Sequence, residues 1–585
     1  MKRDHPMSPA PARECGDDAV ISLPIQWDRH LRAELAVFTA GISPASLALA
    51  LLDWSVHLAV SPGKYWKTSE RWLAETISDQ FSPAPFSARP AVAGDPRFAS
   101  PDWQQWPHCA WRDDFLRCEQ WWQALTTDID GLSAHHQRLT AFCARQWLDP
   151  WSPSNVWWMN PAVLHAAVKT RGGNFLRGLG HWLEDCRNLA GEVGHEPVAE
   201  RPLAYVPGRD VAITPGKVIF RNKLFELIQY TPTTAEVHEE PLLIVPSWIM
   251  KYYILDLQPE DSMVRYLVAH GHTVYIMSWR NPGAEAHELG LDDYLESGLM
   301  TALHVVHAQC GAGGVHAAGY CLGGTLLAIA AARLARDAGG VPLRSMTLFA
   351  TATDFEEPGE LGLYIDDSAL STLEALMRKQ GYLDGPQLAT AFQMLNARDL
   401  VWSRIMGEYL LGERTRPSDL ISWNQDTTRL PCRLHTETLR RLFLDNELAE
   451  GHYCLGGRPV ALSDIDIPVF MVGTEHDHVS PWRSVYKLHL LTRNALTFLL
   501  TSGGHNAGIV SEPGHPRRRF RVQTRPPGAA YRDPDRYLTE AEQHEGSWWP
   551  FWQAWLAANS GKLRPARAPE VNALADAPGQ YVLET

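Results

Sequence analysis

The sequence has 585 residues, a formal net charge of -14 and a pI near 5.9, so a nucleic-acid-binding protein with a basic face is not expected. Hydrophobic residues make up 45% and charged residues 21% of the chain, which is typical of a globular protein with a large core, and the length predicts more than one domain. The nine cysteines include no CxxC pair, which argues against a disulfide framework or a zinc site and favours reduced thiols in the cytoplasm.

The first third of the chain is predicted to be helical. Residues 1–24 are polar and rich in Pro and Ala, which indicates a disordered tail, and residues 25–203 form the expected helical domain. Within it, Leu47, Leu51, Trp54 and Leu58 recur at the spacing of three to four residues typical of one helix face.

A transmembrane segment is not expected in this region. The most apolar stretch, residues 33–60, contains Glu34, Pro44, Asp53 and His57. A membrane span needs about 20 apolar residues with few charges.

The pattern changes near residue 204, where short apolar runs bounded by turn residues begin to alternate with helical stretches such as Leu291–Gln309 and Leu322–Asp337. This alternation predicts a mostly parallel sheet covered on both faces, in a catalytic domain spanning 204–585. A long helical stretch at about 352–465 separates two of the strands and is expected to form a cap over the sheet. The expected strands are Val211–Arg221, Leu224–Tyr230, Leu242–Pro246, Thr273–Trp279, Val315–Ala318, Met346–Ala350, Val469–Gly473 and Leu496–Leu500.

The sharpest local motif is GYCLGG at 319–324, between an apolar strand and an alanine-rich helix. This is the context of a nucleophile elbow, with Cys321 in place of the usual serine. Gly319, Gly323 and Gly324 would let strand and helix pack closely, and the helix dipole would favour the thiolate. A glycine-rich turn around a buried cysteine is the alternative interpretation.

A catalytic acid and a histidine should follow later in the chain. Asp477 and His505 lie just after the strands expected at Val469–Gly473 and Leu496–Leu500, so they are assigned as orienting acid and base. Glu475 is the rival acid, and the neighbouring His476 and His478 are assigned structural or substrate-side roles.

The oxyanion hole needs two backbone donors. One should be the N–H of Leu322, directly after the nucleophile. The other should come from the loop after Leu242–Pro246, at Ile249 or Met250. These assignments predict an α/β-hydrolase fold with a mostly helical cap insertion and an all-helical N-terminal domain.

Several blocks resemble polyhydroxyalkanoate synthases, most closely the single-subunit type that prefers short acyl chains. They are GYCLGG at 319–324, the stretch from KYYILDL to SWRNP at 251–282, DHVSPW at 477–482, GGHNAGI at 503–509 and EGSWWPFWQAWL at 545–556. The block at 43–64 also resembles an N-terminal extension found in part of that family. By position, the family's catalytic residues fall on Cys321, Asp477 and His505.

The resemblance implies that (R)-3-hydroxyacyl-CoA is polymerised with release of CoA, with no metal or separate cofactor. It also implies a cytoplasmic homodimer attached to polyester granules, and His478, Arg398 and Tyr252 are the expected substrate contacts. Two departures are visible. Met250 replaces the family's usual Asn, and Asn396-Ala397-Arg398 replaces an Arg-Pro-Asn run, which leaves Arg398 as the nearest arginine.

Two other functions fit the same residues. The triad could serve a cysteine-dependent thioesterase or an intracellular polyester depolymerase, in which water replaces the hydroxyl acceptor. Alternatively, the chain could be a non-catalytic, granule-associated synthase paralogue, for which Met250 is the one supporting feature. The tryptophan-rich segment Trp548–Trp552 is expected to pack the core, with contact to polymer as the alternative.

Overall fold

The computed structural model describes residues 43–81, 95–193, 203–311, 313–337, 339–395, 397–569 and 573–585. The disordered tail predicted for residues 1–24, the start of the helical domain at 25–42, and Asn396 lie outside these ranges.

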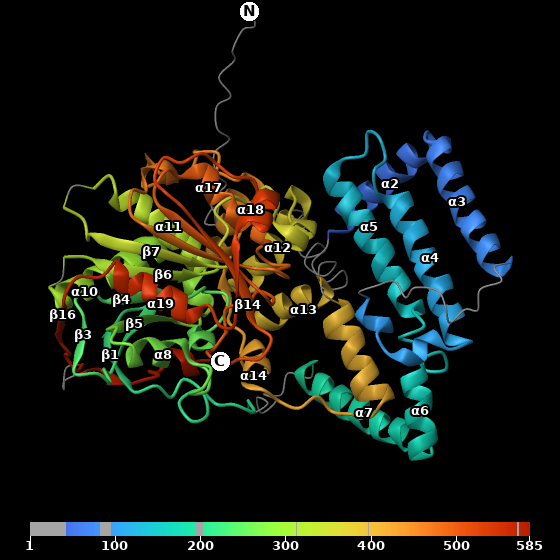
Figure 1. Ribbon diagram of the computed structural model, residues 1–585, viewed down its shortest axis with the longest axis horizontal. Coiled ribbons are helices and arrows are strands. Elements are labelled where there is room, and N and C mark those ends of the chain that lie inside the picture. The colour runs from blue at the N-terminus through green and yellow to red at the C-terminus, as the bar shows by residue number, and fades with distance from the viewer. Residues whose placement is uncertain are drawn as a thin grey trace, which may run out of the picture.

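The N-terminal region is all-helical through its described part, as predicted, and lies beside the sheet-containing region (Figure 1). The first helix of this described part begins at Pro44 and is capped by Ser43, whose side chain accepts a hydrogen bond from the N–H of Ser46. The longer helices are α2 (Pro44–Ala59), α3 (Pro62–Phe81), α4 (His108–Thr126), α5 (Ala134–Leu148), α6 (Pro161–Thr170) and α7 (Gly173–Val193). Short 3₁₀ turns are η2 (Pro96–Phe98), η3 (Pro101–Gln104) and η4 (Asp149–Trp151).

Within the described part of the chain, the second region is built on an eleven-stranded sheet of order β15-β14-β13-β12-β7-β6-β4-β5-β2-β1-β17. The strands from β13 to β5 run parallel, and antiparallel strands extend the sheet at both edges. The parallel strands are β4 (Leu242–Val245), β5 (Val274–Trp279), β6 (Val315–Tyr320), β7 (Leu343–Phe349), β12 (Val469–Thr474) and β13 (Leu496–Thr501). The flanking strands are β1 (Gly216–Arg221), β2 (Phe225–Tyr230), β14 (Arg519–Arg525), β15 (Glu542–Glu545) and β17 (Ala575–Asp576).

The strand boundaries differ from the predicted ones by up to three residues except at one strand, whose predicted start was wrong by five residues. The strand expected at Val211–Arg221 begins only at Gly216, because Pro215 has no N–H for the ladder. Residues before it turn away instead, and the N–H of Ala212 donates to the carbonyl of Asp256.

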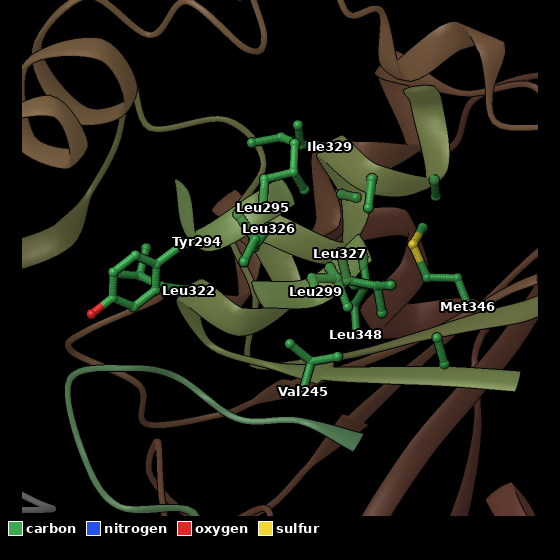
Figure 2. Packing of buried hydrophobic residues seen from close by; sticks show 14 of the residues in the cluster. Val245, Tyr294, Leu295, Leu299, Leu322, Leu326, Leu327, Ile329, Met346 and Leu348 are labelled. Atoms are coloured by element: carbon green, nitrogen blue, oxygen red, sulfur yellow. The ribbon is translucent and has the colours of Figure 1, made fainter. Parts of the chain in front are cut away.

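Both faces of the central strands are buried, which explains their continuous apolar runs. On one face, α11 (Leu322–Leu334) packs Leu326 and Leu327 against Val245, Met346 and Leu348 of the strands (Figure 2). Other helices on that face are α9 (Leu291–Asp293), η7 (Tyr294–Met300) and α10 (Thr301–Cys310), and the opposite face is covered by α8 (Met263–Ala269) and α19 (Trp549–Ala558).

The long segment between β7 and β12 is a mostly helical insertion, as predicted. It lies between the sheet and the N-terminal helices (Figure 1). Its helices are η8 (Gly359–Tyr364), α12 (Asp367–Gln380), α13 (Gly385–Leu395), η9 (Arg398–Trp402), η10 (Ile405–Leu410), α14 (Asp419–Gln425), α15 (Cys432–Glu437) and η11 (Thr438–Leu444). We call this segment the cap.

No single helix in the described ranges is both long and apolar enough to cross a membrane. The helices Pro44–Ala59 and Pro62–Ile77, bent by 85° where they meet, satisfy the length and composition criteria only as a pair.

Candidate active site

Cys321 sits on a strained turn between β6 and α11. Its backbone has φ 53° and ψ -127°, a conformation that few non-glycine residues adopt and that costs roughly 1–3 kcal/mol. The turn is held in place because the N–H of Cys321 donates to the carbonyl of Phe349 at 2.9 Å, and Thr351 Oγ1 donates to the carbonyl of Cys321 at 3.2 Å. The structure therefore presents the thiol at the start of a helix, as the elbow motif predicted.

The three glycines of the elbow are needed for close packing. A Cβ on Gly319 would lie 2.3 Å from the Cα of Gly324, and one on Gly323 would lie 2.4 Å from the carbonyl oxygen of Val245. A Cβ on Gly324 would lie 2.0 Å from Oγ1 of Thr351. Because backbone atoms of β4 and of α11 itself occupy the space, larger residues would push the elbow away from the sheet.

His505 and Asp477 form a buried pair beside this thiol. Nδ1 of His505 lies 2.8 Å from Oδ2 of Asp477, and the ring also interacts electrostatically with Cys321, which lines the same cavity. Asp477 also accepts hydrogen bonds from Thr474 Oγ1 and from the N–H of Ser480, at 2.8 and 2.7 Å. The rival acid Glu475 instead pairs with Arg519 at 2.8 Å.

The pair shifts the pKa of both groups. Burial would lower the pKa of His505, but Asp477 and Cys321 together raise it well above 6.5. Burial would likewise raise the pKa of Asp477, but His505 and the donated hydrogen bonds bring it below 3.8. The arrangement therefore favours an imidazolium flanked by a carboxylate and a sulfur, which suits proton transfer at the thiol.

The loop that carries His505 is fixed by the tryptophan-rich segment near the C-terminus. Trp548 Nε1 donates to the carbonyl of Gly508 and Trp549 Nε1 to that of Ile509, each at 3.0 Å. Both indole rings and that of Trp552 are fully buried, so the tryptophans of this segment pack the core as expected, whereas Phe551 is exposed. The ring of Tyr320 also stacks on His505, with centroids 5.5 Å apart.

A cavity of about 1050 Å³ opens onto Cys321 and His505. The sheet region contributes Ile249, Met250, His476, His478 and Asn506 to its wall. The cap contributes apolar residues such as Leu388, Phe392 and Trp423 together with charged residues such as Arg404 and Glu408, and Asp185 of α7 also lines the wall. The cap therefore covers the reactive thiol, as the long insertion predicted.

The expected oxyanion donors lie on both sides of Cys321. Leu322 occupies the first position of α11, where helix N–H groups have no acceptor within the helix. On the other side, Ile249 and Met250 both line the cavity, but the N–H of Ile249 already donates to Oγ of Ser247 at 3.3 Å. Of the two loop residues proposed from sequence, Met250 is thus the better candidate donor.

Of the three residues expected to contact the substrate, only one lines the cavity. His478 is exposed and lines the cavity. Arg398 lies at the junction of cap and N-terminal helices, where it binds Glu119 and, at 2.8 Å, Asp149, and it does not line the cavity.

Tyr252 is 2% exposed and packs in the core under the loop that follows β4. The structure therefore gives no support to substrate contact by Arg398 or Tyr252. The sequence pattern placed both residues near the site but carried no information on which way their side chains point.

Two groups of residues near the cavity were not anticipated. Asp185 binds Arg404 and Arg414 of the cap, and Lys251 forms a buried 2.6 Å pair with Asp426. The partners of Asp185 follow it by more than 200 residues, so no local signal could have revealed that group. For the second group, the one available hint was that Lys251 is the first residue of the family block at 251–282.

Comparisons with known proteins agree with this geometry. Residues 94–267 match the profile described as the N-terminus of poly-beta-hydroxybutyrate polymerase (PhaC), and residues 25–64 match a second N-terminal profile of the same polymerase. Residues 240–512 match the α/β-hydrolase fold.

Three curated relatives are similar over most of the chain. The poly(3-hydroxyalkanoate) polymerase of Methylorubrum extorquens is 38% identical over 83% of this chain and 80% of its own length. The corresponding PhaC subunit of Rhizobium etli is 36% identical over 89% and 81%, and that of Cupriavidus necator is 37% identical over 79% and 78%. The chain therefore belongs to the poly(3-hydroxyalkanoate) polymerase family, a family of acyltransferase enzymes, here built on an α/β-hydrolase fold.

Proposed function

We propose that this protein polymerises (R)-3-hydroxyacyl-CoA into polyhydroxyalkanoate through a covalent acyl intermediate on Cys321, with release of CoA. The observation that carries the proposal is the placement of Cys321 on a strained elbow in the same cavity as His505, which is paired with Asp477. The similarity to enzymes named poly(3-hydroxyalkanoate) polymerase supplies the substrate class.

In the first half-reaction, the Cys321 thiolate attacks the thioester carbonyl and forms a new carbon–sulfur bond. The oxyanion is stabilised by the N–H groups of Leu322 and Met250. The bond to CoA sulfur then breaks, and the imidazolium of His505 donates its proton to that sulfur. Exchange of one thioester for another is nearly isoenergetic, which suits a cysteine nucleophile.

In the second half-reaction, neutral His505 accepts the proton of the 3-hydroxyl group of another unit. The hydroxyl oxygen attacks the acyl carbonyl, an ester bond forms and the thiolate of Cys321 leaves. Asp477 orients the imidazole and stabilises its charged form in both steps. Repetition of the cycle lengthens the polyester.

Water must be kept from the acyl-enzyme, or hydrolysis would compete with ester formation. The cap supports this requirement because it closes over the thiol with apolar side chains such as Leu388 and Phe392. His478, exposed in the same cavity, is proposed to contact the substrate.

Attachment to a polyester granule is also part of the proposal. Leu52 on α2, Val60 at its end and Trp66 on α3 are 60%, 73% and 72% exposed, and such apolar surface favours contact with a hydrophobic polymer. Replacing all three by glutamate should reduce cosedimentation with poly(3-hydroxybutyrate) granules. Unchanged cosedimentation would contradict this part of the proposal. The homodimer stays a prediction.

The test of the reaction is to supply (R)-3-hydroxybutyryl-CoA and measure CoA, polymer and free hydroxyacid together. We expect CoA and polymer units to form in equal amounts and Cys321→Ala to reduce CoA release by about 10³-fold or more. Free hydroxyacid equal to the CoA released would show a hydrolase instead, and undiminished activity of Cys321→Ala would exclude the acyl-cysteine route.

A further inference from the structure

A short segment of the cap, Trp423–Thr428, contacts the loop after β4. This loop is proposed to supply an oxyanion donor. We call this segment the clamp. Its backbone forms an antiparallel bridge between Thr427 and Met250. In addition, five side chains of the clamp and the loop bond across the contact, so the two segments are joined at several points.

The hydroxyl of Thr428 is the contact nearest to the proposed donor. Its Oγ1 donates to the carbonyl oxygen of Ile249 at 2.5 Å and lies 3.2 Å from that of Trp248. In a trans peptide the carbonyl oxygen and the following N–H point in opposite directions. Fixing the Ile249 carbonyl on one side therefore fixes the N–H of Met250 on the other.

The remaining contacts hold the next residues of the loop. Trp423 Nε1 donates to the carbonyl of Lys251 at 2.8 Å. Asp426 accepts hydrogen bonds from Lys251 Nζ at 2.6 Å and from the hydroxyl of Tyr253 at 2.8 Å. Lys251, Tyr253 and Asp426 are all buried, and a buried ion pair is kept in one geometry by the cost of separating it.

The other end of the loop is fixed by the elbow itself. The space beside Gly323 is filled by the carbonyl groups of Val245 and Pro246, and Trp279 Nε1 donates to the Pro246 carbonyl at 2.9 Å. The loop is thus anchored to the nucleophile helix below and to the cap above, with Met250 between the two anchors.

We infer that the clamp positions the N–H of Met250, so that the oxyanion hole is complete only when the cap is docked. This inference rests on the proposed function. Thr428 is a positioning residue in it: it is 6% exposed and acts through the Ile249–Met250 peptide group, while its neighbour Thr427 lines the cavity. The cap then has two roles, since it excludes water and also sets a transition-state contact.

Thr428→Val tests the inference because valine has nearly the shape of threonine without its hydroxyl, and Thr428→Ser is the control that keeps the hydroxyl. Removing one oxyanion donor costs about 10²–10³-fold, so misplacing it should lower kcat about 10- to 100-fold with little change in KM. Thr428→Ser should stay within about 3-fold of the unmodified enzyme in kcat, because its hydroxyl can still donate to Ile249.

The rate at which iodoacetamide alkylates Cys321 distinguishes a displaced oxyanion donor from a disrupted active site. Alkylation needs the thiol of Cys321 but no oxyanion hole. We expect Thr428→Val to keep an alkylation rate within about 2-fold of the unmodified enzyme while acyl transfer falls. Unchanged kcat in Thr428→Val, or a proportional loss of kcat and alkylation, would overturn the inference. If the valine variant does not fold, Tyr253→Phe is measured in the same way. We expect this variant to lose about 3- to 10-fold in kcat, because Asp426 loses one of its hydrogen bonds. An unchanged kcat in Tyr253→Phe would overturn the inference.

The two proposals fail differently. Absence of CoA release by the unmodified enzyme would contradict the proposed function. Normal CoA release by both the unmodified enzyme and Thr428→Val would contradict the role of the clamp alone.

Discussion

Asp185 of α7 accepts a 2.8 Å hydrogen bond from Arg414 of the cap, although 229 residues separate them. The same carboxylate accepts hydrogen bonds from Arg404 Nη2 and from the hydroxyl of Tyr409, each at 2.8 Å. The hydrogen bonds from Arg414 in particular hold the pKa of Asp185 well below its usual range. An N-terminal helix is thereby tied to the cap at the wall of the cavity.

Asp185→Asn should loosen this attachment. The side chain of Asp185 is 9% exposed, so the change should lower the free energy of unfolding by about 1–3 kcal/mol and speed proteolysis of the cap. Glu184→Gln is the control, because Glu184 is 64% exposed and its ion pair with Arg414 should contribute less than about 0.5 kcal/mol. Urea denaturation of both variants checks this, and equal losses would contradict it.

Two glycines of α7 give a second test of the same contact. A Cβ on Gly178 would lie 1.8 Å from the carbonyl oxygen of Tyr409, whereas nothing lies within 4 Å of one on Gly180. Gly178→Ala should therefore destabilise the protein by about 1–3 kcal/mol, and Gly180→Ala should stabilise it by about 0.5–1 kcal/mol. Thermal unfolding compares the two, and a Gly178→Ala variant as stable as Gly180→Ala would show that α7 does not pack closely on the cap.

Gly323→Ala should displace the turn that carries Cys321, because the added methyl group has no space beside it. The added Cβ would lie 2.4 and 2.5 Å from two backbone carbonyl oxygens of the loop after β4, which cannot move as a flexible side chain would. We expect a loss of about 1–3 kcal/mol of stability and slower alkylation of Cys321 by iodoacetamide. Gly313→Ala, which would meet no atom within 4 Å, should change neither property. A Gly323→Ala variant with normal stability and reactivity would contradict the packing argument.

The central strands could be predicted from sequence because each is a short apolar run with both faces buried. The edge strands β14 and β15 could not. Arg519–Arg525 has five exposed or half-exposed polar positions among its seven residues, and Glu542–Glu545 is polar throughout, so neither differs from a loop in hydrophobicity. Only the pairing of β14 with β13, and of β15 with β14, makes them strands.

The candidate triad could be located from sequence because its residues directly follow the central strands, which could be predicted. The sequence could not predict which way individual side chains point. Arg398 meets Asp149 across 249 residues, and Tyr252 turns into the core one position after the cavity-lining Lys251. Such long-range partners leave no periodic pattern in the chain.

The pair formed by Asp477 and His505 should give a pH-dependent contribution to stability. The folded-state pKa of His505 is above 6.5, so its contribution is complete below pH 6.5 and is lost as the pH rises through the folded value. The folded-state pKa of Asp477 is below 3.8, so its contribution is present above pH 3.8 and is lost as the pH falls through the folded value.

Asp477→Asn should therefore destabilise the protein most near about pH 6, by about 1–3 kcal/mol, and less once the pH rises above the folded-state pKa of His505. Urea denaturation over a series of pH values measures the difference, with the exposed Asp466→Asn as the control. The same variant should lower turnover by about 10²–10⁴-fold. A destabilisation that does not change with pH would contradict the charged pairing.

The most direct test of the account is to find the acyl group on the enzyme. The protein is mixed with (R)-3-hydroxybutyryl-CoA, quenched in acid within the first turnover and digested, and the peptides are examined by mass spectrometry. The account predicts a hydroxybutyryl thioester on Cys321 that is absent from Cys321→Ala and accumulates in His505→Gln if acylation still proceeds. A hydroxybutyryl group on another residue, or polymer formation by Cys321→Ala, would contradict it.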